Sequence, residues 1–112
     1  MVKKLDQNVA LVTAEGKLMG GPETAHLCKE VEELERAGYK RIVLDLSRVR
    51  WATSTAIGAL IKSFLSLRNQ GAELRFACPS EKLRYYMTIT KLIQVIPTFD
   101  SLDEAITAPA QG

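Results

Sequence analysis

The period of the hydrophobic positions changes in the middle of the chain, near residue 53. Before it, a short run rich in β-branched residues predicts a strand that is covered on both faces: Ile42, Val43, Leu44 and Leu46. After it, apolar residues recur at helical spacing along one stripe: Ile57, Leu60, Ile61, Phe64 and Leu65. Gly71 stands where a helix ends in a left-handed residue. Residues 41–71 are therefore predicted to form a strand, a short polar turn and a helix.

The pattern of hydrophobic and turn-forming residues also predicts strands and helices in the rest of the chain. Residues 2–5 and 9–14 resemble two strands of a hairpin, and a helix with Pro22 in its first turn is expected to stop at Gly38. A strand is expected at 73–77, and a helix capped by Ser80 follows it. We expect a short strand at 95–96 and a last helix that begins at Ser101, where Ser101 and Glu104 have capping-box spacing.

An initial hairpin followed by alternating helices and strands predicts a single α/β domain with a mixed β-sheet flanked by helices. The chain has 112 residues, which allows one core. We place the domain at residues 1–107 and the segment 41–46 in the interior of the sheet. Residues 108–112 are small, polar and interrupted by Pro109, so we expect this tail to be frayed.

Composition narrows the classes of function. The formal net charge is only +2, and no basic stripe with interleaved aromatic residues argues for nucleic acid binding. The cluster Arg48, Arg50, Lys82 and Arg84 is interpreted as solvated surface. No apolar run is long enough to span a membrane, and no signal-peptide core is recognisable, so we expect a cytoplasmic protein without direct membrane insertion. Cys28 and Cys78 are expected to be reduced, small buried residues.

Signals for catalysis or metal binding are weak. Gly16-Lys17 lacks the first glycine of a phosphate-binding loop, because Leu11 occupies that position. His26 is the only histidine and no Cys-x-x-Cys pair exists, so we expect no metal, no cofactor and no enzyme. Trp51 is interpreted as a packing residue at the strand end, with a partner anchor as the less favoured alternative.

Three consecutive hydroxyl residues, Thr53, Ser54 and Thr55, stand between the central strand and helix. A helix N-terminus presents free backbone N–H groups and the positive end of the helix dipole, and it can therefore hold a negative charge. Ser54 has two interpretations that can coexist. Its oxygen could cap the helix, or it could accept a phosphoryl group.

Three segments resemble STAS domains, the anti-sigma factor antagonists of bacteria. They are I-V-L-D-L-S-R-V-R-W-A-T-S-T-A-I-G-A-L-I at 42–61, G-K-L-M-G-G-P-E-T-A at 16–25 and K-L-I-Q-V-I-P-T-F-D-S-L-D-E-A-I at 91–106. The resemblance covers nearly the whole chain in order and spacing. It implies a mixed sheet flanked by helices, in agreement with the pattern above.

In phosphorylatable members of that family the turn reads Asp-Ser-Ser/Thr-Gly, and the first Ser accepts phosphate from a serine kinase that is also the anti-sigma factor. The resemblance places Ser54 on the acceptor position and Thr55 beside it as the fallback. Thr53 replaces the Asp, and Ala56 replaces the first Gly. Asp45 matches an acidic position of the family; we expect it to cap the following turn and, secondarily, to support the acceptor site.

The resemblance implies an anti-sigma factor antagonist that regulates transcription by partner switching under control of Ser54 phosphorylation. Its partners would be an anti-sigma factor that is a serine protein kinase and, if the chain is phosphorylated, a phosphatase; the chain itself would be a monomer or weak dimer. The expected docking surface comprises Gly20, Gly21, Thr53, Ser54, Thr55, Ala56, Ile57 and Gly58. The alternatives are an unphosphorylated scaffold of a signalling assembly, a soluble accessory subunit of a membrane transporter, and a small-ligand carrier with a groove near the same helix end.

Overall fold

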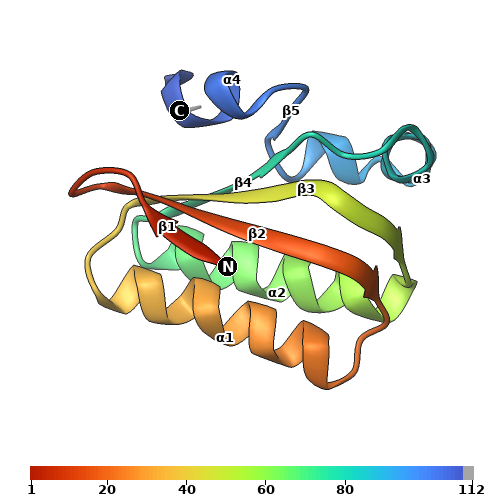
Figure 1. The fold of residues 1–112 in the computed structure, drawn as a ribbon, viewed down its shortest axis with the longest axis horizontal. Coiled ribbons are helices and arrows are strands. Elements are labelled where there is room, and N and C mark those ends of the chain that lie inside the picture. Colours follow the sequence, from red (N-terminus) through yellow and green to blue (C-terminus); the bar gives the residue numbers. More distant parts are fainter. Residues whose placement is uncertain (110–112) are drawn as a thin grey trace.

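A mixed sheet with strand order β1–β2–β3–β4–β5 forms the centre of the molecule, for which a computed structural model describes residues 1–109 (Figure 1). The strands are β1 (Val2–Lys4), β2 (Val9–Leu18), β3 (Arg41–Ala52), β4 (Glu73–Ala77) and β5 (Thr98–Phe99). β1 pairs antiparallel with β2, and all other neighbours are parallel. The predicted hairpin, the mixed α/β class and the interior position of β3 are confirmed.

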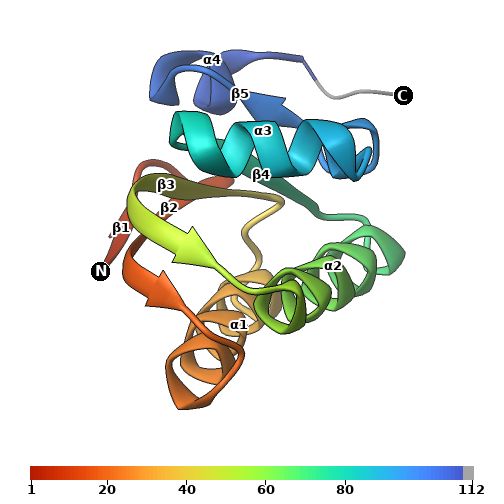
Figure 2. The same cartoon turned by 90° about the vertical axis from the view of Figure 1, so that its right-hand side faces the viewer.

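Two layers of helices cover the sheet. α1 (Pro22–Arg36) and α2 (Ser54–Asn69) lie on one face. The opposite side carries α3 (Glu81–Ile89), the short 3₁₀ helix η1 (Leu92–Gln94) and α4 (Leu102–Thr107), as Figure 2 shows. Parallel strands need such crossover segments, which bury both faces of the strands that they connect.

The expected helix signals form local contacts. Pro22 occupies the first turn of α1, and Gly71 follows α2 with a φ of +78°. The Ser80 hydroxyl oxygen accepts a hydrogen bond from the Leu83 N–H at 3.2 Å. The Ser101 oxygen accepts one from the Glu104 N–H at 3.1 Å, and the Ser101 hydroxyl donates to the Glu104 carboxylate at 3.2 Å. These capping and stop signals are confirmed.

Two apolar clusters of unequal size hold the layers together. The larger one lies between the sheet and helices α1 and α2, and it extends to α3. The smaller one lies under α4 and contains fully buried Val43, Ala77 and Ala105. Residues 42–46 of β3 contribute to both clusters, so this segment is buried on both faces as its composition predicts.

β3 extends beyond the predicted interior segment 41–46 and ends at Ala52, directly before the hydroxyl turn. Residues 48–52 pair with an equally extended β2, and the register shifts twice along this stretch. Ser47, Arg48 and Arg50 are exposed, since α4 does not reach this half of the strand. In a strand with one solvated face, apolar and polar residues alternate, as they do in this half of β3.

The predicted strand at 95–96 is wrong, because β5 lies beyond Pro97. Lys91 adopts a left-handed conformation with a φ of +63° and starts η1, and the Ile96 N–H then bonds back to the Leu92 carbonyl at 3.0 Å. The Ile96 N–H group is therefore bonded within this 3₁₀ turn and cannot pair with a neighbouring strand. The chain resumes pairing only where the Pro97 carbonyl accepts from the Phe76 N–H at 2.9 Å.

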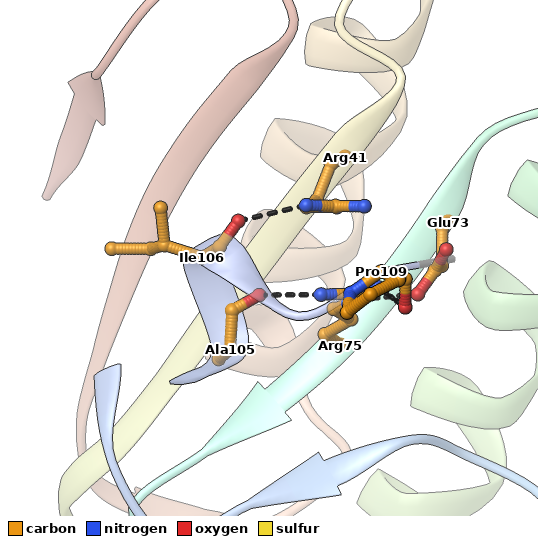
Figure 3. A network of polar contacts seen from close by, with 6 residues as sticks. All are labelled: Arg41, Glu73, Arg75, Ala105, Ile106 and Pro109. Carbon is orange, nitrogen blue, oxygen red and sulfur yellow. Dashed lines mark hydrogen bonds and ion pairs between the residues drawn. The ribbon is translucent and has the colours of Figure 1, made fainter. Parts of the chain in front are cut away.

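The C-terminal segment is attached by a buried guanidinium (Figure 3). Arg75 is fully buried on β4, and it donates to the carbonyl oxygens of Ala105 and Pro109, each at 2.9 Å. Its Nε pairs with the Glu73 carboxylate. Arg41 adds a bond to the Ile106 carbonyl at 2.8 Å. Arg75 thus contacts Pro109 within the expected tail, whose fraying stays a prediction; residues 110–112 lie outside the described residues.

Replacing Arg75 should destabilise the domain. Arg75→Met leaves the Glu73 carboxylate and two carbonyl groups without their buried partner, so the free energy of unfolding should fall by about 3 kcal/mol. Urea denaturation measures this loss, and hydrogen exchange should show the fastest opening in α4. Arg50→Met, on the exposed half of β3, is the control and should change stability by less than about 0.5 kcal/mol. Equal losses in both variants would contradict the anchoring role.

Candidate functional site

The hydroxyl turn between β3 and α2 assigns different roles to neighbouring residues. Thr53 is the N-cap: its Oγ1 accepts from the Ala56 N–H at 3.2 Å, and its own N–H donates to the Leu18 carbonyl at 2.9 Å. Ser54 is therefore the first residue of α2. The interpretation of Ser54 as N-cap is wrong, because capping requires the extended backbone that Thr53 adopts.

The side chain of Ser54 is left available. Ser54 and Thr55 are both exposed, and the described residues offer the Ser54 hydroxyl no hydrogen-bond partner. No acidic residue lies in the first turn of α2. An anion at this position would meet backbone N–H donors and the positive end of a helix of 16 residues.

The loop between β2 and α1 packs directly against this turn. Gly20 has a φ of +89°, and a β-carbon at this position would lie 2.6 Å from Thr55 Cγ2 and 3.3 Å from the backbone nitrogen of Ala56. Only a residue without a side chain permits this approach. The structure thus brings the predicted Gly20–Gly21 loop next to the predicted hydroxyl turn.

Two residues that the sequence analysis missed hold this loop in place. The Glu23 carboxylate accepts hydrogen bonds from the backbone N–H of Met19 at 2.7 Å and from that of Gly21 at 3.3 Å. The Gly20 N–H donates to the hydroxyl of buried Thr24 at 3.0 Å. The Met19 N–H above all lowers the pKa of Glu23. An acidic residue directly after Gly-Gly-Pro was the available signal.

Not every predicted docking residue is accessible. Ala56 and Ile57 are buried in the larger core, and Gly58 and Thr53 are half-buried. The accessible surface therefore consists mainly of Ser54 and Thr55, with the half-buried glycine loop beside them. Ala56 and Ile57 support the surface from below and do not form part of it.

Trp51, three residues before Ser54, is not a core residue. Its side chain is 40% exposed, and the Lys82 ammonium lies 4.4 Å from the ring centroid. Within the basic cluster, Arg48 lies 3.4 Å from the Glu15 carboxylate and Arg84 pairs with Asp100. Three of the four cations are thus engaged locally, as expected of solvated surface.

Asp45 lies in the middle of β3, so no turn follows it directly. Its carboxylate accepts a hydrogen bond from the Ser47 N–H at 2.9 Å, within the strand. Burial raises the pKa of the Cys78 thiol, and the negative charge of Asp45 adds to this effect. Cys28 and Cys78 are half-buried, less than the sequence suggests.

His26 is an exposed residue of α1 whose ring nitrogen lies 3.8 Å from the Glu30 carboxylate one helical turn away. Among residues 1–109, no three His, Cys, Asp or Glu side chains converge on a possible metal position. None of the helices in this range is long and apolar enough to cross a membrane.

The comparison with known families decides the membership of this chain. The family model described as STAS domain matches residues 1–105. The chain belongs to the STAS domain family. A Thermotoga maritima protein whose name assigns it to the anti-sigma factor antagonists is 29% identical over 86 residues, which are 75% of this chain and 76% of that protein.

Solved structures support the same assignment. The crystal structure of a Thermotoga maritima protein with this designation has a TM-score of 0.79 and 27% identity, and the match covers 94% of this chain and 89% of that one. An anti-sigma factor antagonist from Mycobacterium paratuberculosis shares the fold, with a TM-score of 0.80 at 23% identity, and the match covers 96% of this chain and 90% of that one. This STAS domain is thus similar in sequence to proteins named as anti-sigma factor antagonists.

Two further structures share the fold alone. The phosphorylated form of the Bacillus cell fate determinant SpoIIAA has a TM-score of 0.70 at 12% identity, covering 94% of each chain. The STAS domain of a SulP transporter from Vibrio cholerae has a TM-score of 0.72 at 16% identity, covering 94% and 83%. One architecture therefore serves both phosphorylated and transporter-attached proteins.

Gly20→Ala should disturb the hydroxyl turn specifically. Its positive φ costs a side chain about 1–2 kcal/mol, and the collision with Thr55 adds to this loss. NMR should show shifted amide resonances at residues 54–56. Gly38→Ala is a matched control, because Gly38 also has a positive φ of +103° but nothing lies within 4 Å of its β-carbon position. Equal effects of both variants on residues 54–56 would contradict the packing role of Gly20.

Acid should loosen the glycine loop. A carboxyl group whose pKa is lower in the folded than in the unfolded state contributes stability at neutral pH and loses it as the pH falls through the folded value. The amide shifts of Met19 and Gly21 should accordingly titrate below the usual range of a glutamate. Glu23→Gln should abolish this transition, and Glu35→Gln, at the other end of α1, should leave it intact. Amide shifts that stay constant through acidification would contradict the role of Glu23.

Proposed function

We propose that this STAS domain is a non-catalytic, cytoplasmic anti-sigma factor antagonist. In this proposal it docks on an anti-sigma factor with serine kinase activity and displaces a sigma factor from it. Phosphorylation of Ser54 then weakens the docking, and a phosphatase restores it. The docking surface is centred on Ser54 and Thr55 and includes the loop at Gly20 and Gly21.

The observation that carries the proposal is that Thr53 and Ser54 have different roles at the start of α2. Thr53 caps the helix, which leaves the exposed Ser54 hydroxyl free for a kinase. Recognition sites commonly lie on such loops at the ends of strands and helices. The glycine loop beside it supplies a rigid second edge, since Glu23 and Thr24 fix its backbone.

Thr53 replaces the aspartate of the family pattern, and the structure supplies a reason why this change is tolerated. Asp and Thr are both favourable N-cap residues, so the helix start is preserved while a negative charge is lost. The loss of this charge concerns the kinase reaction and not the fold. Position 53 is therefore where this chain departs most from the phosphorylatable pattern.

A phosphoryl group on Ser54 should leave the isolated domain folded. It carries about −1.5 to −2 charges at neutral pH, and at this position it meets a favourable dipole and N–H groups. The complex should suffer, because the same charge would lie in the middle of the docking surface and lose its water there. Partner affinity is thus the quantity that phosphorylation changes.

A constitutive scaffold or a transporter subunit is the competing proposal. The missing carboxylate at Thr53 favours a protein that is never phosphorylated, and the likeness to a SulP transporter domain extends the fold to membrane transport. Recovery of transporter components from the native cytosol, without a kinase-like partner, would favour this second function.

The decisive experiment combines phosphorylation with binding. The protein is incubated with its anti-sigma factor kinase and ATP, and mass spectrometry maps the modified residue, which should be Ser54. Ser54→Asp should bind the partner at least about tenfold more weakly, a change of 1.4 kcal/mol. Its melting temperature should stay close to that of the wild type.

Ser54→Ala is the first control and should bind the partner but resist modification. Ser66→Asp is the matched charge control, because Ser66 is an exposed residue near the other end of α2. It should leave binding unchanged. No label on Ser54, combined with undiminished binding by Ser54→Asp, would leave only the scaffold function.

A further inference from the structure

A groove crosses the edge of the sheet where β3 and β4 begin, at the opposite end of α2 from Ser54. Its volume is about 780 Å³, within the range of small-molecule sites. The turn between β1 and β2, the last turns of α2 and the segment before β5 form its walls. The side chains that matter for its chemistry are Asp6, Lys40, Arg41, Phe64, Arg68 and Val95.

Positive charge is in excess in this groove. Its lining contains three cations, Lys40, Arg41 and Arg68. Of its two carboxylates, that of Glu73 is neutralised by buried Arg75, and that of Asp6 accepts hydrogen bonds from the N–H groups of residues 8 and 9 at 2.6 and 2.8 Å. Lys40 and Arg68 have no ion-pair partner within residues 1–109, so the field in the groove favours an anion.

The C-terminal end of α2 opposes an anion, because its free carbonyl groups carry partial negative charge. Arg68 lies in the last turn and offsets this effect. Lys40, directly before β3, adds a second free cation, whereas the Arg41 guanidinium is bound to the Ile106 carbonyl. The charges of Lys40 and Arg68 together exceed the single charge of the Asp6 carboxylate and about half a charge from the helix end.

An apolar wall accompanies the cations. Val95 is 47% exposed, although it follows a helical turn packed against the larger core. Phe64 lines the groove from α2, and Pro97 continues the apolar surface toward β5. An inorganic anion would contact the cations and leave this wall in water. The lining therefore fits a ligand with both a charged and an apolar part.

We propose that the groove binds a small organic monocarboxylate with a short apolar body. Its carboxylate lies between Lys40 and Arg68, and its body covers Val95 and Phe64. The alternative of a small-ligand carrier has its groove near the N-terminal end of the central helix, whereas this groove lies at the C-terminal end. The site is independent of Ser54 and of the proposed docking function.

An NMR titration of the unmodified protein with 4-phenylbutyrate tests the site. Amide shifts should change at residues 40–41, 68–73 and 95–97 and leave residues 53–58 unaffected. Inorganic phosphate provides only the negative charge of such a ligand, and 4-phenylbutanol provides only its apolar body. Each should therefore bind at least about tenfold more weakly than 4-phenylbutyrate. Equal binding of phosphate, equal binding of the alcohol, or shifts outside the groove would each overturn the proposal.

Charge variants locate the contacts. Lys40→Gln and Arg68→Gln should each weaken 4-phenylbutyrate binding about three- to fivefold, as expected of exposed charge pairs. Lys62→Gln removes an exposed cation of the same helix outside the groove and should have no effect. All three side chains at issue are exposed, so the variants should fold. A uniform response of the three variants would indicate non-specific charge attraction and overturn the site.

Discussion

Strand β3 is buried on both faces over residues 42–46, and it therefore needs an apolar cover above and below the sheet. α1 and α2 provide one cover through a large continuous core. The other cover is α4, a helix of six residues that is too short to be stable by itself. The buried guanidinium of Arg75 supplies what the small apolar cluster lacks, because it attaches the end of α4 to β4 through two carbonyl groups. The second face of the central strand is closed by hydrogen bonds as much as by hydrophobic contact.

Because α4 covers only part of β3, the rest of this strand exposes polar side chains to solvent. α4 protects the beginning and middle of β3 and leaves the later half, with Arg48, Arg50 and Trp51, in contact with solvent. That half carries the chain to Thr53, where α2 begins. At the other edge, where the strand starts, Lys40 and Arg68 line a groove. The two candidate sites thus lie at the two ends of α2, and each depends on an element that packs on β3.

Sequence patterns predicted what depends on local chemistry. The change of period near residue 53, the stop at Gly71 and the caps at Ser80 and Ser101 are short-range features, and all are present in the structure. Sequence patterns did not predict features that depend on contacts between residues far apart in the chain. An arginine within a short strand resembles an exposed residue, and the burial of Arg75 depends on carbonyl groups 30 and 34 residues later in the chain.

The candidate site shows the same limit on a smaller scale. Thr53 and Ser54 are neighbours with similar hydroxyl groups, and the sequence analysis considered the capping role for Ser54, whereas Thr53 caps α2 in the structure. The bond from the Thr53 N–H to the Leu18 carbonyl keeps Thr53 aligned with the end of β2, in the extended backbone of an N-cap. Ser54 consequently enters the helix with its side chain exposed. Threonine and aspartate are both favourable N-cap residues, so Thr53 meets the requirement of the fold at this position. The proposed phosphorylation of Ser54 depends on another property of the same position, the charge of a neighbouring carboxylate, which threonine lacks. The start of the helix and the proposed regulation therefore depend on different properties of residue 53.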